Sequence, residues 1–269
     1  MMVSGLADKT IAVFRRDLLT SIRYRSAFTV TAGGAMLELA AFYYLAKAIG
    51  PGFRPAGLDY FSYLVVGTGF YTFLMMGIHA FLRSVQEAQQ NGTFEVLMTT
   101  STPPPVLLLL SAISAFSRNV AQLLLYLGAG LLLFNGTLPK PHLIAALLIF
   151  CLSLVIAIAI GMIAAALQVT MQKGSVVLWA LGSGAWLLTG TLFPVANLPG
   201  PLRSVAGLIP LTHVMDAMRR ALLQGAGVVA LRQQIGIVAA FSLVLLPLSL
   251  LMFAYSVRRA RQEGTLSNY

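Results

Sequence analysis

Gly182-Ser183-Gly184 is the stretch of this sequence that comes nearest to a hydrolase motif. An intramembrane serine protease would use Gly-x-Ser-Gly, with the serine as nucleophile and a histidine on a nearby helix as its base. Here position 181 is Leu, and His213 follows in a segment outside the apolar runs. We therefore expect no catalytic residue. A serine protease stays a remote alternative, which labelling with a serine-reactive probe would test.

Metal and nucleotide chemistry also lack their usual residues. The histidines (His79, His142 and His213) are scattered, and the one cysteine, Cys151, cannot form a cysteine cluster, so no metal site is expected. The phosphate loop Gly-x-x-x-x-Gly-Lys-Ser/Thr does not occur. We expect this chain to bind no cofactor, and any ATP and Mg would be bound by a partner subunit.

Glu38 is the sharpest single candidate, because it lies about eleven residues into an apolar run. A carboxylate at mid-membrane is costly and is a functional candidate by default. It could bind a cationic head group or relay protons. Equally, it could be hydrogen-bonded to neighbouring helices or face a wet cleft. With Phe70 and Phe73 as apolar walls, Glu38 is our candidate for a substrate path, although such walls would also suit lipid-facing surfaces.

The amino-acid composition indicates whether this chain lies in water or in a membrane. The chain is 58% hydrophobic and 10% charged, with a mean hydropathy of +0.84, which is typical of an integral membrane protein. A membrane-spanning helix needs roughly 20 apolar residues. We predict an all-α protein with six transmembrane helices. The predicted spans are 27–49, 60–82, 119–138, 143–168, 175–193 and 235–257.

Basic residues indicate the orientation. They are dense in both tails, which an even number of spans places on one side, and basic flanks stay cytoplasmic. Residues 1–26 place Ile11, Phe14, Leu18 and Ile22 on one helical stripe, so we expect an interfacial helix there, ahead of a membrane domain at 27–269. The net charge of +10 is attributed to orientation and to anionic lipid, and no nucleic acid partner is expected.

The longest predicted cytosolic connection is residues 83–118. Within it, Gly92 allows a tight turn, Thr93 is suited to cap a short helix, and Glu95 lies in its first turn against the positive end of the dipole. Phe94, Leu97 and Met98 give this helix an apolar face, as docking into a partner requires. Gln89, just before it, is expected to tolerate substitution by alanine.

This segment resembles the type-two permease subunits of ABC exporters, which share the architecture of the G-subfamily ABC transporters. Their motif is Gly-Thr-x-Glu, then an apolar pair and a Thr-Pro or Ser-Pro; here the prolines begin two residues later, at Pro103. The matching residues are Gly92, Thr93, Glu95, Val96, Leu97 and Thr100. The resemblance implies that this is the coupling helix, which enters a cleft of a separate nucleotide-binding ATPase subunit.

A second block, residues 189–225, resembles the same family. The matching residues are Gly190, Phe193, Pro194, Leu198, Pro199, Pro210, Leu211, Thr212, Ala217, Arg219 and Gly225. The prolines should end the fifth span and leave two short helices, at 202–209 and 212–224. The resemblance implies that they form an external re-entrant segment at 194–230, with Phe193, Pro194, Pro210 and Arg219 as external gate residues.

The resemblance further implies an exporter permease without ATPase activity of its own, in a prokaryotic plasma membrane, paired with a second permease copy as a homodimer or heterodimer. The substrate is less defined. Polysaccharide exporters of this family carry Arg-Asp-Leu-Lys and then Leu-Gly-x-x-Trp, and only the first part is approached here, by Arg16-Asp17-Leu18-Leu19. We therefore expect an amphiphilic small molecule or lipid, with a glycan exporter as the alternative. An ion-driven secondary transporter is a remote alternative that leaves the cytosolic helix unexplained.

Overall fold

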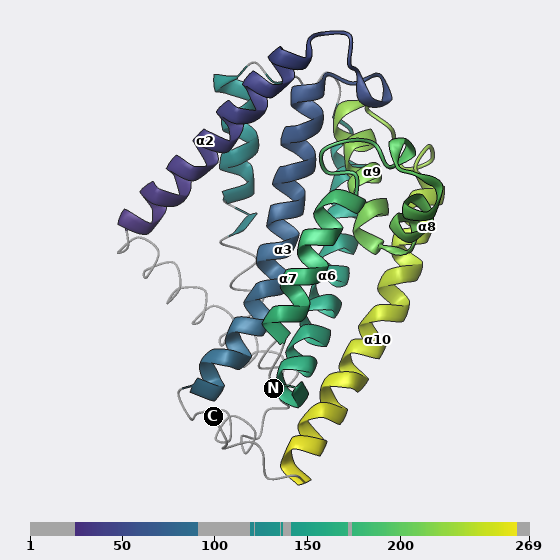
Figure 1. Ribbon diagram of the computed structural model, residues 1–269. Coiled ribbons are helices and arrows are strands. Elements are labelled where there is room, and N and C mark those ends of the chain that lie inside the picture. The colour runs from purple at the N-terminus through teal and green to yellow at the C-terminus, as the bar shows by residue number, and fades with distance from the viewer. Residues whose placement is uncertain are drawn as a thin grey trace, which may run out of the picture.

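The computed structural model describes residues 25–90, 119–120, 122–134, 136, 141–171 and 174–262. Within these ranges the chain forms only helices and the loops between them, and the long helices run side by side (Figure 1). In chain order these are α2 (Arg25–Ile49), η1 (Pro55–Gly57), α3 (Tyr60–Gln90), the Gln122–Leu133 helix, α6 (Leu143–Met171), α7 (Gly174–Leu188), η2 (Val195–Asn197), α8 (Gly200–Leu208), α9 (Pro210–Leu223) and α10 (Arg232–Gln262).

Three of these helices are long and apolar enough to cross a membrane: Tyr60–Gln90, Leu143–Thr170 and Arg232–Ala260. The helices confirm the all-helical prediction, and these three candidate spans coincide with the predicted spans 60–82, 143–168 and 235–257. The helices α2, Gln122–Leu133 and α7 occupy the other three predicted spans, but within the described residues they do not meet both criteria. Those three spans therefore stay predictions.

The connection after the second predicted span does not begin as a loop. The sequence predicts a loop from residue 83 onward, yet α3 continues as one helix to Gln90. Val85, Ala88 and Gln89 recur at helical spacing and are buried, so this last part of α3 has an inward-facing side of its own. The predicted interfacial helix and coupling helix lie outside the described residues, apart from the last two residues of the former.

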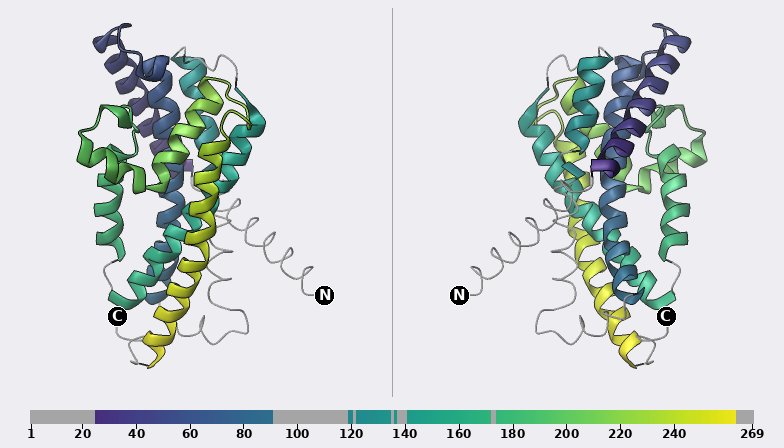
Figure 2. Two further views of the ribbon diagram at one scale, coloured as in Figure 1. Left: turned by 90° about the vertical axis from the view of Figure 1, so that its right-hand side faces the viewer. Right: turned by 90° about the vertical axis from the view of Figure 1, so that its left-hand side faces the viewer.

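Helix α6 lies at the centre of the bundle, between α3 and α10, and α9 packs against all three. The largest core cluster joins these four helices, and its fully buried side chains include Phe81, Ile156, Met162, Met215 and Phe253. Helices α8 and α9 lie toward one end of the bundle, away from the C-terminal end of α10 (Figures 1 and 2). This arrangement brings the α7–α8 connection and α9 close to the start of α3.

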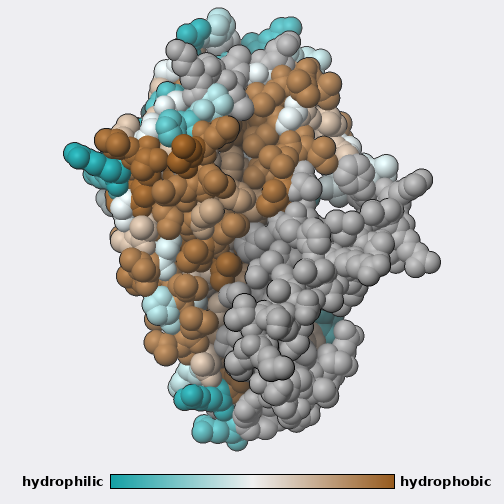
Figure 3. Space-filling model, turned by 180° about the vertical axis from the view of Figure 1, so that it is seen from behind, coloured by the Kyte–Doolittle hydropathy of each residue, from teal (hydrophilic) through white to brown (hydrophobic). Residues whose placement is uncertain are grey.

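The outward faces of the bundle are apolar. On α6 and α10, Leu143, Leu147, Leu243 and Leu251 have exposed fractions between 63% and 76%. Seen from behind, apolar side chains cover most of the visible described surface, and hydrophilic ones gather at the two ends (Figure 3). Contiguous apolar surface on this scale marks a membrane or protein interface. Together with the long apolar helices, it identifies the chain as a membrane protein.

Candidate functional site

Arg219 is buried inside the bundle although it carries a charge. It lies on the inward face of α9, with an exposed fraction of 4%, beside the buried residues Met215 and Met218. Its guanidinium donates three hydrogen bonds to backbone carbonyls: Nε to Tyr63 at 3.3 Å, Nη1 to Gly190 at 2.8 Å and Nη2 to Thr191 at 2.8 Å. One side chain of α9 thus holds both α3 and the loop after α7.

Tyr63 completes the contact from α3. The Arg219 Cζ atom lies 3.7 Å from the centroid of the Tyr63 ring, a cation–π geometry. The Tyr63 hydroxyl donates to the Gly190 carbonyl at 2.8 Å, so this carbonyl accepts from both side chains. Tyr60, Phe61 and Tyr63 have exposed fractions of 9% or less, so the start of α3 packs its aromatic rings inside the bundle.

Two glycines make this arrangement possible. A Cβ atom on Gly67 would lie 1.7 Å from Arg219 Nη2 and 3.0 Å from the Thr191 carbonyl oxygen. Gly190 has φ +76°, a left-handed conformation that favours glycine, where the chain turns out of α7. We refer to Tyr63, Gly67, Gly190, Thr191 and Arg219 as the arginine junction.

The charge of Arg219 is balanced by dipoles and by an aromatic face. Among the described residues no carboxylate lies within ion-pair distance of it; Asp216, one turn earlier on α9, pairs with Arg220 at 3.9 Å on the exposed side. Burial lowers the pKa of Arg219 to about 10, which leaves the guanidinium charged at neutral pH. Three carbonyl oxygens and the Tyr63 ring therefore stabilise a cation that burial alone would disfavour.

Of the predicted external gate residues, Arg219 is part of this junction. Phe193 and Pro194 follow Thr191 after Leu192, and Pro194 precedes η2. Pro210 is the first residue of α9, where its fixed φ and missing N–H suit a helix start. The sequence did not predict the contributions of Tyr63, Gly67 and Thr191. The available signal was the four-residue spacing of Tyr63 and Gly67, which places both on one face of α3.

The predicted substrate-path residues are not brought together. Phe70 and Phe73 have exposed fractions of 6% and 2%, and both contact Phe150 of α6, with ring centroids 6.3 Å and 5.2 Å away. They fill the core between α3 and α6. Glu38 is half-buried on α2, in a different packing cluster. Their role in a path stays a prediction, as does the role of the coupling residues from Gly92 to Thr100, which lie outside the described part of the chain.

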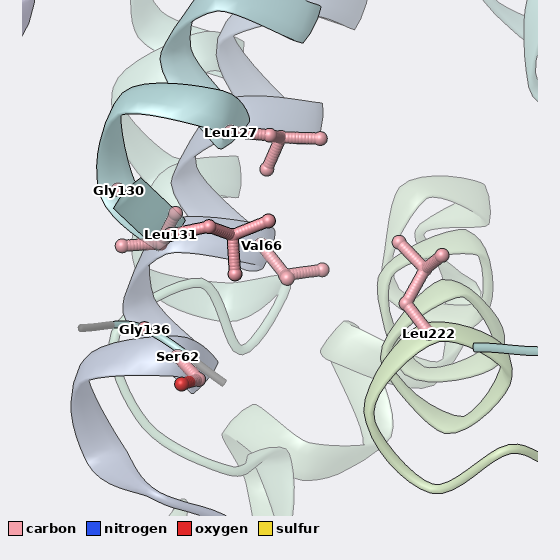
Figure 4. Close-up of a pocket in the computed structure, with 8 residues that line it drawn as sticks. Ser62, Val66, Leu127, Gly130, Leu131, Gly136 and Leu222 are labelled. Carbon is pink, nitrogen blue, oxygen red and sulfur yellow. The ribbon is translucent and has the colours of Figure 1, made fainter. Parts of the chain in front are cut away.

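A small cavity adjoins the junction. It lies between Ser62 and Val66 of α3, Leu127 and Leu131 of the Gln122–Leu133 helix, and Leu222 of α9 (Figure 4). Its volume is about 20 Å³ and its lining is almost entirely apolar. Drug-sized ligands occupy pockets of roughly 300 Å³ or more. This cavity is therefore too small for a drug-sized substrate.

The residues considered for catalysis have local structural partners. The Ser183 hydroxyl donates to the Trp179 carbonyl at 2.8 Å, a common arrangement for a serine within a helix. His79 on α3 bonds the Met75 carbonyl at 2.7 Å, and His213 on α9 bonds the Gly207 carbonyl at 2.9 Å. Nothing in the described part of the chain brings three metal-ligating side chains together.

Comparison with known proteins adds a family to this geometry. Residues 47–251 match the family described as ABC-2 family transporter protein. The match runs from the end of α2 into α10, so it includes the arginine junction and two whole long spans with much of the third. No curated protein matches the chain.

Proposed function

Because the chain belongs to the ABC-2 transporter family, we propose that it is the membrane-spanning permease subunit of an ATP-driven ABC exporter. The observation that carries this proposal is the family match, which covers residues 47–251. Members of this family are membrane subunits that generally work with a separate ABC ATPase. The absence of a phosphate loop from the sequence supports that division of labour.

Helix α3 would connect the ATPase with the opposite end of the permease. Its last residue, Gln90, lies two residues before Gly92, where the predicted coupling segment begins, and its first turn contains Tyr63 of the arginine junction. A helix of 31 residues is about 46 Å long. A displacement of the coupling helix by its ATPase would therefore be transmitted along α3 to the α7–α8 loop and α9, which Arg219 fastens to it.

The remaining features of the proposal follow the sequence. Six spans place both termini and residues 83–118 in the cytosol and the segment 194–230 outside, in the plasma membrane of a prokaryote. A second permease copy, identical or not, completes the translocation path. The substrate is an amphiphilic small molecule or lipid, which suits the apolar composition of the bundle.

Leu97→Asp tests the coupling helix, because it would place a charge in the apolar face that docks into the ATPase. We expect the variant to insert and fold but to lose the ATPase that co-purifies with the wild-type permease in mild detergent, as measured by mass spectrometry and ATP hydrolysis. Gln90→Ala is the control, because Gln90 is exposed at the end of α3.

The outcomes separate two parts of the proposal. If no ABC ATPase co-purifies with the wild-type chain from its native membranes, the permease assignment fails. If the ATPase co-purifies equally with wild type and Leu97→Asp, and transport is unchanged, residues 92–101 are a polar loop and not a coupling helix.

A further inference from the structure

Glu38 lies at a three-helix contact that its sequence position did not reveal. On α2, the residues that pack inward include Ala35, Leu39 and Phe42. Glu38 comes three residues after Ala35 and four before Phe42, so it lies on the same side of the helix. They meet Phe61 and Val65 of α3 and Tyr126 of the Gln122–Leu133 helix. The carboxylate is half-buried at the edge of this apolar cluster.

Tyr126 supplies the second polar group at this contact. Its exposed fraction is 8%, and its hydroxyl is buried without a hydrogen-bond partner. The ring packs against α3, where a Cβ atom on Gly69 would lie 3.0 Å from Tyr126 Cδ1. Tyr126 packs in the same cluster as Ala35, Leu39 and Phe42, and the helical spacing places Glu38 on that side of α2. An unpartnered buried hydroxyl is unfavourable, so a ligand that bonds it would stabilise this contact.

The chemistry of this pair selects one class of ligand. Among the described residues no basic side chain pairs with Glu38, so its negative charge is available to a cation. The Tyr126 oxygen can accept a hydrogen bond, and the surrounding side chains are apolar. Leu37, the preceding residue, has an exposed fraction of 75%, so α2 presents an exposed apolar face next to the one that carries Glu38.

We propose that Glu38 and Tyr126 form a binding site for the protonated amine of a lipophilic cation. The ammonium group lies against the Glu38 carboxylate and donates an N–H to Tyr126 Oη, while the apolar part lies along the exposed face of α2. This proposal rests on the proposed permease function and narrows its substrate class. Glu38 lies outside the residues that match the family, so the family match does not imply this site.

Three ligands with the same tail separate charge from hydrogen bonding: dodecylamine, dodecyltrimethylammonium and dodecanol. Binding of each radiolabelled ligand would be measured on the purified permease in phosphatidylcholine nanodiscs, with empty nanodiscs subtracted. We expect wild type to bind dodecylamine most tightly and dodecanol least. Glu38→Gln should weaken both cations about tenfold, as the loss of a charge-assisted contact predicts, and leave dodecanol unchanged.

Tyr126→Phe keeps the packing of the ring and removes only the hydroxyl. It should weaken dodecylamine about fivefold and leave dodecyltrimethylammonium, which has no N–H, unchanged. Glu87→Gln is the matched control, because Glu87 is an exposed carboxylate on α3, and it should bind all three ligands like wild type.

Equal binding of the three ligands by wild type would overturn the proposal. So would unchanged dodecylamine binding in Glu38→Gln or, if that variant does not fold, in Tyr126→Phe. These measurements need no ATPase, so their failure would leave the permease assignment intact. Conversely, a wrong permease assignment would be revealed by the absence of a co-purifying ATPase, whatever the result of the ligand-binding measurements.

Discussion

Among single residues, Gly67 matters as much as Arg219, because the guanidinium occupies the space that a side chain at position 67 would fill. The close approach of Nη2 leaves no room for even one methyl group. In a membrane helix, small residues commonly serve close packing between helices. Here the partner is a buried charged side chain, that of Arg219.

Gly67→Ala should displace the guanidinium from the Gly190 and Thr191 carbonyls. We expect a loss of stability of about 2–3 kcal/mol, since hydrogen bonds from a charged group are worth more than neutral ones and overpacking adds strain. The measurement is thermal unfolding of the purified protein in detergent, where the melting temperature should fall by several degrees.

Gly33→Ala is the matched control for this change. Gly33 is an exposed residue within α2, and a methyl group added there would have no neighbouring atom within 4 Å. Alanine is favoured over glycine inside a helix by about 0.5–1 kcal/mol, so the control should not lower the melting temperature. Equal behaviour of the two variants would show that Gly67 is not held against Arg219 in solution.

At the scale of elements, the helix ends were harder to predict than the helices. The apolar runs located α3, α6 and α10, and the prolines located α8 and α9, because both signals are local; α8 and α9 start at Gly200 and Pro210, two residues before the predicted starts at 202 and 212. The end of α3 was missed because residues 83–90 are polar in sequence. Their burial depends on α6, a contact that no local pattern encodes.

Local sequence patterns were also insufficient to predict the arginine junction. Arg219 and Gly190 were found through motif resemblance, whereas Tyr63 and Thr191 act through the placement of a ring and a backbone oxygen. A backbone carbonyl has no sequence signature, so its participation in binding a charge can be seen only once the chain is folded. Sequence reasoning therefore found the cation of the junction and missed most of its acceptors.

Gln89 makes a contact between helices that the sequence did not reveal, and this changes the effect expected of its substitution. The sequence predicts that Gln89→Ala has little effect, yet Gln89 and Gln168 are buried and their side-chain amides are 3.4 Å apart, joining α3 to α6. From the structure we expect Gln89→Ala to lower stability by about 1 kcal/mol through the lost bond and the void. Chemical unfolding would measure it against Gln90→Ala, which changes an exposed neighbour; equal stability of the two would show that this bond contributes nothing.

For the whole molecule, the testable property is its orientation in the membrane. With Cys151 replaced by Ala, because Cys151 is exposed, single cysteines at Val229 and Gln262 report on the two ends of the bundle. Val229, in the connection between α9 and α10, has an exposed fraction of 81%, and Gln262 is exposed at the end of α10. A membrane-impermeant maleimide should label Val229→Cys in intact cells and Gln262→Cys only after the membrane is broken.

Val229 lies just before α10 and Gln262 at its end, so each cysteine serves as the control for the other. Labelling of Gln262→Cys but not Val229→Cys in intact cells would reverse the orientation. Labelling of both in intact cells would mean that α10 does not cross the membrane, which would contradict its identification as a span.

The arginine junction also bears on which sequences could replace this one. Every amino acid has a backbone carbonyl, so the acceptors at positions 63, 190 and 191 survive almost any change of side chain there, apart from the ring at Tyr63 and the left-handed turn at Gly190. A carboxylate partner would instead have tied the charge to one or two residue types. The hydrogen bonds that join α9 to the rest of the bundle should therefore tolerate substitutions at the acceptor positions. Substitutions at Gly67 and Arg219 should not be tolerated. Substitutions that alter the α7–α8 loop could accumulate without loosening these bonds.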